Sequence, residues 1–546
     1  MSAPSASAGL VNTDQTLAVS NILTLSSNSV NETRGQFTHS NLSAQPTDLT
    51  GAAVSISGVA SFGRLSGSPT GRVNDLAEVT DNFSLRKGAH AFRAGVNFLY
   101  NDTTITFPRS SRGSYSYSSL NNFLNGTYNN SGFTQTFGNS TVDQTNPNFG
   151  LYVQDEWKLA PSFTLNLGLR YDLEWLQTIA VQNGNVSPRA GFAWSPFGSR
   201  SGTVIRGGFG IFYDRIPLRP LANALLSSNN TTTLAATSQV SISLSPTQTG
   251  APTFPNIVNA LPSTLPAGVL VSYTTMNPNM KNAYSDQGNF EIEQRLGRNS
   301  TLSVGYQHVR GLHLIVSINQ NVPTCAAVGT NNGCRPNPNY ANNSQYRSAA
   351  DSQYDGLHVS FVQHPVRWGS YRVSYAYSKA DDNVSEFFFS SPIDPTNIWR
   401  DWGRSDDDQR HRFVFNGVAH APFGFQLSTM LQYYSALPLN ITTGANTIQG
   451  TAARPTVNGA FIGRNTGAGA DFLNLNVRLS RGFQIRERLR MEALAEAFNS
   501  LNHRNNLTFN GVFGTGAYPA NPSPTFGQVT AVNDPRVMQL ALRFKF

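Results

Sequence analysis

The sequence predicts an all-β protein, a transmembrane antiparallel β-barrel of about 16–22 strands with short periplasmic turns and long extracellular loops. Three observations indicate this fold. The composition is poor in both charged and apolar residues, strands of membrane-spanning length alternate between apolar and polar side chains, and short and long connections follow one another regularly along the chain.

The composition excludes several other classes of protein. Of the 546 residues, 13% are charged and 39% are hydrophobic, and Asn, Ser, Thr, Gly and aromatic residues make up the difference. A barrel produces this mixture because its lipid and lumen faces alternate and its loops are polar. No run of 18 or more apolar residues occurs, which excludes spanning helices. The net charge of +8 is scattered without a basic block, so nucleic acid is not an expected partner.

The last ten residues carry the clearest pattern. Met538, Leu540, Leu542, Phe544 and Phe546 share one face of a strand, and Gln, Arg and Lys alternate with Val and Ala on the other. A period of two with one fully apolar face predicts a strand with lipid on one side and water on the other. A chain that ends on such a strand, with a final aromatic residue, predicts a barrel closed by its last strand in an outer membrane.

The same alternation predicts a series of hairpins with tight turns. Strands such as Phe163–Trp175 are about twice the usual length in soluble sheets, whereas membrane strands need about 9–11 residues. The predicted hairpins pair Leu76–Leu85 with Ala91–Tyr100, Phe149–Leu159 with Phe163–Trp175, Pro188–Pro196 with Thr203–Tyr213, Tyr284–Leu296 with Thr301–Arg310, Asp355–Gln363 with Tyr371–Lys379, His411–His420 with Phe425–Ser435, and Phe472–Ser480 with Leu489–Phe498.

Two further strands complete the predicted barrel. With Gly51–Phe62 as the first strand and Val537–Phe546 as the last, the count is about 16, an even number, as is usual for such barrels. We therefore assign residues 51–546 to the barrel. Residues 1–50 are expected to be an irregular segment, with partial strands as the alternative.

The connections between the hairpins are long and polar. They are Asn101–Asn148, Asp214–Ala283, Gly311–Tyr354, Ala380–Arg410, Ala436–Asp471 and Asn499–Arg536. If Phe546 lies in the periplasm, every tight turn is periplasmic and every long loop is extracellular, which is the asymmetry of outer-membrane barrels. We expect ligand contacts in the first two of these loops, although no single residue there stands out.

The only two cysteines, Cys325 and Cys334, lie in one loop rich in Asn, Gly and Pro. Their close spacing in an exported loop favours a disulfide, which would stabilise the loop by roughly 2–3 kcal/mol. Two unpaired thiols are the alternative. A zinc site is not expected because two further ligands at suitable spacing are missing.

Several strings of residues go beyond this pattern. They are NFGLYVQDEWKLAPSFTLNLGLRYD (Asn148–Asp172), SPRAGFAWSPFGSRSGTVIRGGFGIFYDR (Ser187–Arg215), NPNMKNAYSDQGNFEIEQRLGRNSTLSVGYQHVRGLHL (Asn277–Leu314), VSYAYSKADDN (Val373–Asn383), DDQRHRFVFNGVAHAPFG (Asp407–Gly424), EAFNSLNH (Glu496–His503) and DPRVMQLALRFKF (Asp534–Phe546). In this order, from about residue 75 to the end, they resemble the barrels of TonB-dependent receptors, especially the Oar-like group.

The resemblance implies uptake of bulky ligands through a barrel that an N-terminal plug blocks and the inner-membrane TonB complex energises. The start of this chain has neither the basic nor the apolar region of a signal peptide. No TonB box, plug domain or carboxypeptidase-regulatory-like module is recognisable. We therefore expect the C-terminal barrel portion of such a receptor, in the outer membrane of a Gram-negative-type bacterium. Its implied partners are outer-membrane lipid, the barrel-assembly machinery, and the TonB complex through the missing plug alone.

Three groups of residues could be mistaken for chemical sites. Asp406, Asp407 and Asp408, with Asp381, Asp382 and Asp401 nearby, could bind Ca²⁺ at the outer rim, but the calcium-loop spacing is absent and solvated loop acids are favoured. Gly207, Gly208 and Gly210 faintly resemble a phosphate loop. A strand kink or clearance in the lumen is the favoured interpretation. The third group consists of Asp407, Arg410, His411 and Arg412. A row of charges that faces the lumen or the rim is the favoured interpretation, and acid–base chemistry is the alternative. We expect no enzyme activity, no metal site and no cofactor.

The remaining candidates are charged residues that face inward on the predicted strands. They are Arg170, Asp172, Glu174, Arg189, Arg206, Arg478, Arg490 and Glu492. In a plugged receptor they would contact the plug, and in an open barrel they would line a polar channel. Sequence leaves both roles open.

Three functions compete at this stage. The leading one is import of a bulky nutrient (an oligosaccharide, a peptide or a metal chelate) by the barrel of a TonB-dependent receptor. The others are a structural or adhesive surface barrel, whose loops bind partners, and a passive pore without a plug.

The resemblance assigns the last strand as the signal that the barrel-assembly machinery reads, with Phe544 and Phe546 as its key residues. Deleting Phe546, or replacing both phenylalanines with Asp, should impair outer-membrane assembly of the full-length parent protein. Cell fractionation and heat-modifiability on gels measure this. Unaltered insertion of both variants would contradict the assignment.

Overall fold

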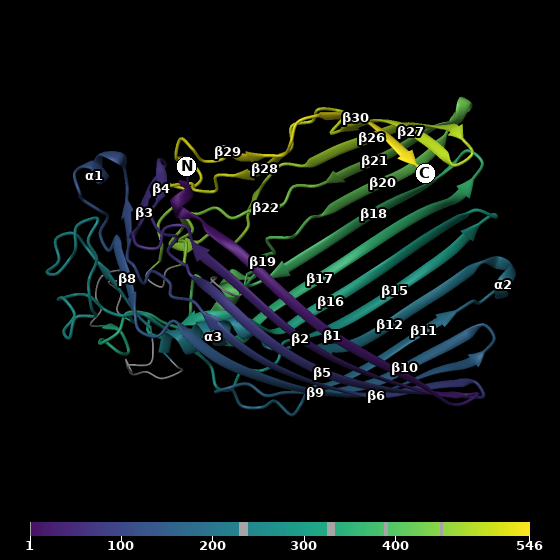
Figure 1. The fold of residues 1–546 in the computed structure, drawn as a ribbon, viewed down its shortest axis with the longest axis horizontal. Helices are drawn as coiled ribbons and strands as arrows, with labels where there is room; N and C mark the ends of the chain where they lie inside the picture. Colours follow the sequence, from purple (N-terminus) through teal and green to yellow (C-terminus); the bar gives the residue numbers. More distant parts are fainter. Residues whose placement is uncertain (1, 229–238, 325–333, 387–390, 448–450) are drawn as a thin grey trace.

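The computed structural model describes residues 2–228, 239–324, 334–386, 391–447 and 451–546. The main element is one 19-stranded sheet that curves into a barrel (Figure 1). Its long strands are β1 (Ala8–Ser26), β2 (Ser29–Pro46), β5 (Thr70–Lys87), β6 (His90–Thr106), β9 (Thr141–Ala160), β10 (Phe163–Glu174), β11 (Val186–Trp194), β12 (Thr203–Tyr213), β15 (Tyr284–Leu296), β16 (Ser300–Asn319), β17 (Asn343–Val366), β18 (Gly369–Asp382), β20 (His411–His420), β21 (Phe425–Tyr434), β26 (Phe472–Arg486), β27 (Leu489–Phe498) and β30 (Val537–Lys545).

These strands follow one another in chain order, and each pairs antiparallel with the next. Two short strands join the same sheet: β14 (Tyr273–Met276) runs parallel to β17, and β19 (Gly403–Arg404) pairs with β18. The predicted all-β antiparallel barrel is confirmed. The predicted bounds of β12, β15, β20 and β27 agree with the structure residue for residue.

The two ends of the barrel differ as predicted. The tight turns between paired strands lie at one end, to the right in Figure 1, and we call this the turn end. The long connections lie at the other end, which we call the loop end, and they carry most of the remaining elements. These elements are η1 (Pro4–Ala6), β3 (Ala53–Ile56), β4 (Ala60–Phe62), β7 (Ser114–Tyr117), α1 (Leu120–Leu124), β8 (Phe133–Phe137), α3 (Leu218–Ser228), β13 (Val240–Leu244), η3 (Ile398–Asp401), β22 (Pro438–Leu439), β23 (Thr456–Val457), β24 (Ala460–Phe461), β25 (Gly467–Ala468), β28 (Asn506–Phe509) and β29 (Val529–Val532).

Two short elements belong to the turn end: α2 (Gly198–Ser201) and η4 (Pro422–Gly424). Every helix in the described ranges is too short or too polar to span a membrane.

Several strands are longer than the sequence predicts. β17 has 24 residues, which is roughly 80 Å at about 3.3 Å per residue, whereas a tilted strand needs about 9–11 residues to cross the hydrocarbon. The extra length lies toward the loop end. There both faces of a strand meet water or protein, so the apolar–polar alternation that identifies a strand in the sequence is lost.

The expectation for residues 1–50 is wrong. They contain β1 and β2, two full strands of the main sheet that stay paired from Ala8–Pro46 to Ser26–Ser29. The alternation of β1 is hard to recognise because Thr13, Gln15 and Asn21 interrupt its apolar face. The pairing of β2 with β5 then continues the barrel without a break.

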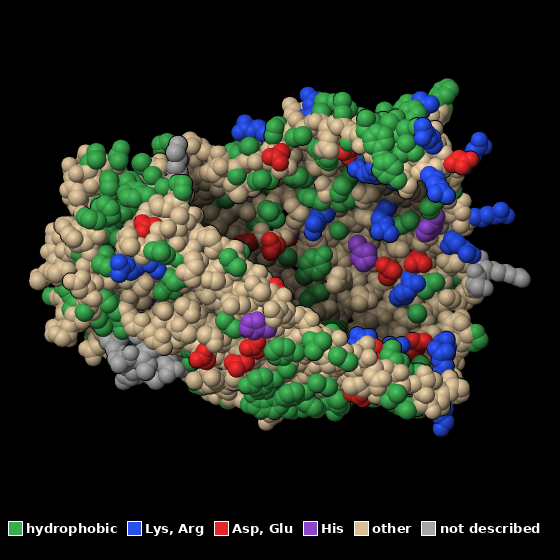
Figure 2. All heavy atoms as spheres, in the orientation of Figure 1, with side chains coloured by type: hydrophobic (Ala, Val, Ile, Leu, Met, Phe, Trp, Pro, Cys, Tyr) green, Lys and Arg blue, Asp and Glu red, His purple; other side chains and the backbone are tan. Residues whose placement is uncertain are grey.

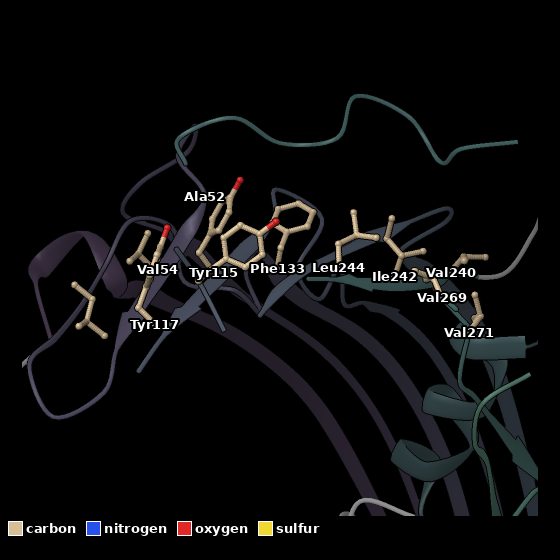
Figure 3. Close-up of a cluster of buried hydrophobic side chains, with 12 residues drawn as sticks. Ala52, Val54, Tyr115, Tyr117, Phe133, Val240, Ile242, Leu244, Val269 and Val271 are labelled. Carbon is tan, nitrogen blue, oxygen red and sulfur yellow. The ribbon is translucent and has the colours of Figure 1, made fainter. Parts of the chain in front are cut away.

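The predicted first strand, Gly51–Phe62, is also wrong. It forms β3 and β4, which belong to a separate five-stranded sheet in the order β13-β8-β7-β3-β4. Residues from three long connections supply its core, in which Tyr115, Phe133 and Ile242 are fully buried (Figure 3). This small sheet gives the loop end a packed domain of its own.

The edges of the main sheet differ from the expected closure on the last strand. Within the described residues, β30 pairs with β27 alone and β1 pairs with β2 alone. The side chains of both edge strands are exposed almost throughout. We call the space between these strands the gap.

Gly369, the first residue of β18, has a backbone conformation that other residues rarely adopt. Gly369 has a φ of 147°, and a Cβ built on it would lie 2.1 Å from the carbonyl oxygen of Val418. Gly369→Ala should therefore destabilise the folded barrel by about 1–3 kcal/mol. Urea unfolding of the refolded chain, followed by heat-modifiability on gels, measures the difference.

Gly482→Ala is the matched control, because a Cβ at Gly482 in β26 would meet nothing within 4 Å. Equal stability of the two variants would contradict the role assigned to Gly369.

Candidate functional site

The interior of the barrel is polar. Figure 2 shows the molecule hollowed between the N-terminal and C-terminal strands, with basic, acidic and histidine side chains gathered in the hollow. On β10 the charged side chains occupy one face and the leucines the other, as the alternation predicts. The hollow and the loop end together are the candidate functional site.

Four of the predicted inward-facing residues come together. Arg170, Asp172, Glu174 and Arg189 all line a cavity of about 470 Å³ near the loop end of β10. Arg170 donates to Asp172 at 2.6 Å, and the guanidinium of Arg189 lies 4.2 Å from the ring centre of Phe212. Their role toward a plug or a ligand remains a prediction.

Glu174 has a more specific role than the sequence suggested. It is buried, and it accepts hydrogen bonds from the backbone N–H of Ile216 at 3.0 Å and from the side-chain amides of Asn146 and Asn282 at 3.0 and 2.8 Å. Its carboxylate thereby ties the long β12–β15 connection to the barrel wall.

The other predicted inward-facing residues lie apart from this cavity. Arg206 pairs with Glu293 at 3.0 Å, on strands β12 and β15. Near the C-terminal edge, Arg478 pairs with Glu496, Glu492 with Arg543, and Arg490 donates to Gln484. These contacts join neighbouring strands or the two sides of one turn.

Sequence reasoning missed a set of histidine–carboxylate pairs. Each pair joins two different strands of the barrel. The pairs are His39–Asp75 at 2.6 Å, His90–Asp155 at 2.7 Å, His308–Asp355 at 2.7 Å and His358–Glu291 at 3.3 Å. The strands are neighbours in the first three pairs, and in the fourth pair β16 lies between β15 and β17. Spacing along one strand cannot reveal them, because the partners come from different strands.

The acids considered for Ca²⁺ bind basic side chains instead. Asp382 pairs with Arg464, Asp401 with Arg454 and Asp381 with Lys379. Within the described ranges no group of three or more His, Cys, Asp or Glu side chains could hold a metal ion. Asp381, Asp382 and Asp401 thus form ion pairs, whereas Asp406 and Asp407 are exposed, as the favoured interpretation of solvated loop acids predicts.

Asp394 shows the electrostatics of this rim. Burial alone would raise the pKa of its carboxyl group, but hydrogen bonds from Thr396 and the charge of Arg400 outweigh burial and lower the pKa. A carboxylate held in this way stays ionised, and it fixes the turn that leads into η3.

Asp408, and not Asp407, is the centre of the charged residues that follow β19. Its side chain is fully buried and accepts from Arg404 at 2.6 Å and from the backbone N–H of Ala380 at 2.8 Å, with Arg410 at 3.2 Å. The other members of the cluster separate: His411 contacts Tyr375, and Arg412 lies over Tyr434.

The glycines of β12 make room for neighbouring side chains. A Cβ at Gly207 would lie 2.6 Å from the ring of Phe192, and one at Gly210 would lie 3.0 Å from the ring of Phe212. Clearance for aromatic rings, which the sequence did not suggest, accounts for these two glycines. Gly208 has only ordinary contacts, the nearest at 3.5 Å.

Two further predictions concern the last strand and the loop with the two cysteines. Phe544 lies on β30 opposite Met491 of β27, and Phe546 is 96% exposed one residue beyond the end of β30. Their role in assembly remains a prediction. The predicted disulfide involves Cys325, which lies outside the described residues.

The loops expected to carry ligand contacts form packed structure. Besides the small sheet, α3 packs Leu221 and Ala224 against Met276, Met280 and other residues of the barrel rim. A weak indication was present in the sequence, since short alternating runs such as Ser114–Tyr117 and Val240–Leu244 have strand periodicity.

Comparisons with known proteins agree with this fold. The family model described as "Outer membrane beta barrel domain" matches residues 3–179, 177–463 and 453–539. No curated protein matches the sequence. Among solved structures, the outer membrane transporter YddB from Escherichia coli is similar over 99% of this chain and 64% of its own, at 14% identity and a TM-score of 0.65.

Two import receptors are similar over almost the whole chain. The ferric-catecholate import receptor Fiu from Escherichia coli matches 99% of this chain and 65% of its own, at 10% identity and a TM-score of 0.54. A mutant of the ferric enterobactin receptor PfeA from Pseudomonas aeruginosa matches 98% and 62%, at 12% identity and a TM-score of 0.56. This chain thus spans less than two thirds of the length of each structure.

The buried position of Asp408 predicts that its carboxylate stabilises the β18–β20 connection. Asp408→Asn keeps the shape of the side chain but leaves Arg404 and Arg410 without their carboxylate, which should cost about 3 kcal/mol. The 383–410 loop should become sensitive to limited proteolysis, and urea unfolding should shift to lower concentration.

Asp407→Asn is the control, because Asp407 is exposed beside Asp408. If both variants resist protease as well as the parent chain does, Asp408 does not hold this loop.

Proposed function

Because this chain belongs to the family of outer membrane beta barrel domains, we propose that it is the barrel of a TonB-dependent receptor of the Oar-like group, which imports a bulky nutrient across the outer membrane. The nutrient would be an oligosaccharide, a peptide or a metal chelate. The observation that carries the proposal is the fold likeness to a transporter and two import receptors over 98–99% of this chain.

The geometry of the hollow supports import over a merely structural barrel. A structural barrel has no need for a wide interior, whereas here charged pairs such as Arg170–Asp172 and Arg206–Glu293 line a hollow that side chains do not fill (Figure 2). The interior charges are compensated across strands, so a plug or a solute can move past them without meeting an uncompensated charge.

The loop end supports ligand capture. Its small sheet and the packed α3 helix provide ordered surfaces outside the membrane, where a binding site must lie if the ligand is to be collected before transport. Ordered loops lose less conformational entropy on binding than free loops do. Energy coupling through TonB would require a plug domain in the same receptor.

The proposal is tested in the native host. A strain without the gene for this chain should lose uptake of one radiolabelled nutrient from a panel of oligosaccharides, peptides and ferric chelates, and the gene alone should restore it. Inactivation of TonB should abolish the same uptake, because import against a gradient needs energy from the inner membrane.

Two results would contradict the proposal. Uptake that persists without TonB would indicate a passive pore, which conductance of the refolded chain in planar bilayers would then detect. Loss of surface attachment without any loss of uptake would indicate an adhesive barrel.

A further inference from the structure

The turn end of the barrel is strongly basic. Eight tight turns join paired long strands, and we consider these turns with two residues on each side of them, together with the last two residues of the chain. These segments hold ten basic residues and one acidic residue, Glu487. The basic residues are Arg86, Lys87, Arg200, Arg295, Arg298, Arg367, Arg486, Arg488, Arg490 and Lys545. Because the net charge of the whole chain is +8, the rest of the chain is close to neutral.

The positive charge is thus scattered along the sequence but collected in space. Figure 2 shows Lys and Arg side chains, in blue, along the turn end at the right of the molecule. Elsewhere in the barrel many basic side chains are compensated, as in the pairs Arg206–Glu293 and Arg404–Asp408. A local excess of one sign of charge attracts partners of the opposite sign.

Four of the turn-end residues are exposed and, among the described residues, their side chains form no ion pair. They are Lys87 at the end of β5, Arg298 between β15 and β16, Arg367 between β17 and β18, and Arg488 between β26 and β27. Each comes from a different turn. Their charges are therefore available to an anionic partner outside the chain.

Exposed aromatic side chains in the same region indicate where the membrane ends. Trp368 directly follows Arg367, Trp194 ends β11, and Phe197 and Phe423 lie in two further turns. Outer-membrane barrels carry such aromatic residues at the level of the lipid headgroups, and their tight turns face the periplasm. The basic residues of the turns thus lie level with the headgroups of the inner leaflet, which consists of phospholipid.

We propose that the turn end binds anionic phospholipids of the inner leaflet, whose phosphate groups accept hydrogen bonds from Lys87, Arg298, Arg367 and Arg488. The distribution of these residues favours lipid over a protein partner. They come from turns between β5 and β27, which are spread around the rim of the barrel (Figure 1). Lipid surrounds a barrel on all sides, whereas a single protein would touch one side. The inference depends on the position of the barrel in the membrane and not on uptake.

The test measures which lipid the barrel retains at its surface. The full chain is refolded into phosphatidylcholine bilayers that contain a trace of spin-labelled phosphatidylglycerol or spin-labelled phosphatidylcholine. Electron paramagnetic resonance then gives the fraction of each label that the protein immobilises. We expect a preference of about threefold or more for phosphatidylglycerol at low salt, because each nearby Lys or Arg adds to the attraction. The preference should fall toward one in about 0.5 M KCl, because salt screens exposed charges.

Two variants with the same loss of charge locate the site. One carries Lys87→Gln, Arg298→Gln, Arg367→Gln and Arg488→Gln, and its preference should fall close to one. The matched control carries Arg112→Gln, Arg215→Gln, Lys281→Gln and Arg504→Gln, all at exposed positions of the loop-end connections, and it should keep the preference of the parent chain.

Two double variants keep the test valid if the fourfold turn-end variant does not refold. They are Lys87→Gln with Arg298→Gln, and Arg367→Gln with Arg488→Gln. Each should lose about half of the preference on a logarithmic scale, because the contributions of the basic residues add.

Three results would overturn the inference. The first is equal retention of the two lipids by the parent chain. The second is a preference that the refolded turn-end variants keep. The third is a preference that the loop-end control loses as well, since net charge alone would then account for it. Equal retention of the lipids, combined with sedimentation of the parent chain with purified peptidoglycan, would identify the cell wall as the partner instead. None of these results bears on TonB-dependent uptake.

Discussion

The pairing of backbone N–H and C=O groups between neighbouring strands is the constraint on which the rest of this barrel depends. The hydrocarbon offers no water to replace a lost ladder bond, so the strands must stay in register across it. β5 and β6 do so from Gly71–Thr106 to Lys87–His90. Where the register shifts, it shifts beside a turn, as between Gln363 and Val366, or toward the loop end, as between Gly311 and Leu314.

Once the backbone hydrogen bonds between strands have formed, the two faces of the sheet carry different kinds of side chain. The outer face needs only apolar surface, and an exposed pair such as Leu167 and Leu169 satisfies it. The inner face holds charges, and each exposed pair such as Arg206–Glu293 contributes only about 0–1 kcal/mol to stability. These pairs therefore matter for the interior more than for folding. They leave a hollow whose charges are locally balanced, which suits the proposed import of large solutes.

The sequence predicted the parts of the fold that the membrane dictates. β12, β15, β20 and β27 were predicted to the residue because one face of each is largely apolar at a period of two and a tight turn marks one end of each strand. β1 was missed because Thr13, Gln15 and Asn21 interrupt its apolar face, and the small sheet was missed because its strands come from three separate connections. Among the site residues, the inward direction of Arg170 and Asp172 follows from periodicity, but the burial of Asp408 does not. That burial depends on Ala380, Arg404 and Arg410, and no local pattern encodes how a loop folds back onto a strand.

The charged side chains of the loop end are more deeply buried than those of the barrel wall, and this limits which groups could contact a ligand. Its carboxylates are used to hold the loops together: Asp382 and Asp401 each bind an arginine, and Asp408 lies between two. Charges committed in this way are poor ligand contacts, because a ligand would have to break a buried ion pair to use them. Recognition at this rim therefore falls to shape and to neutral hydrogen-bonding groups.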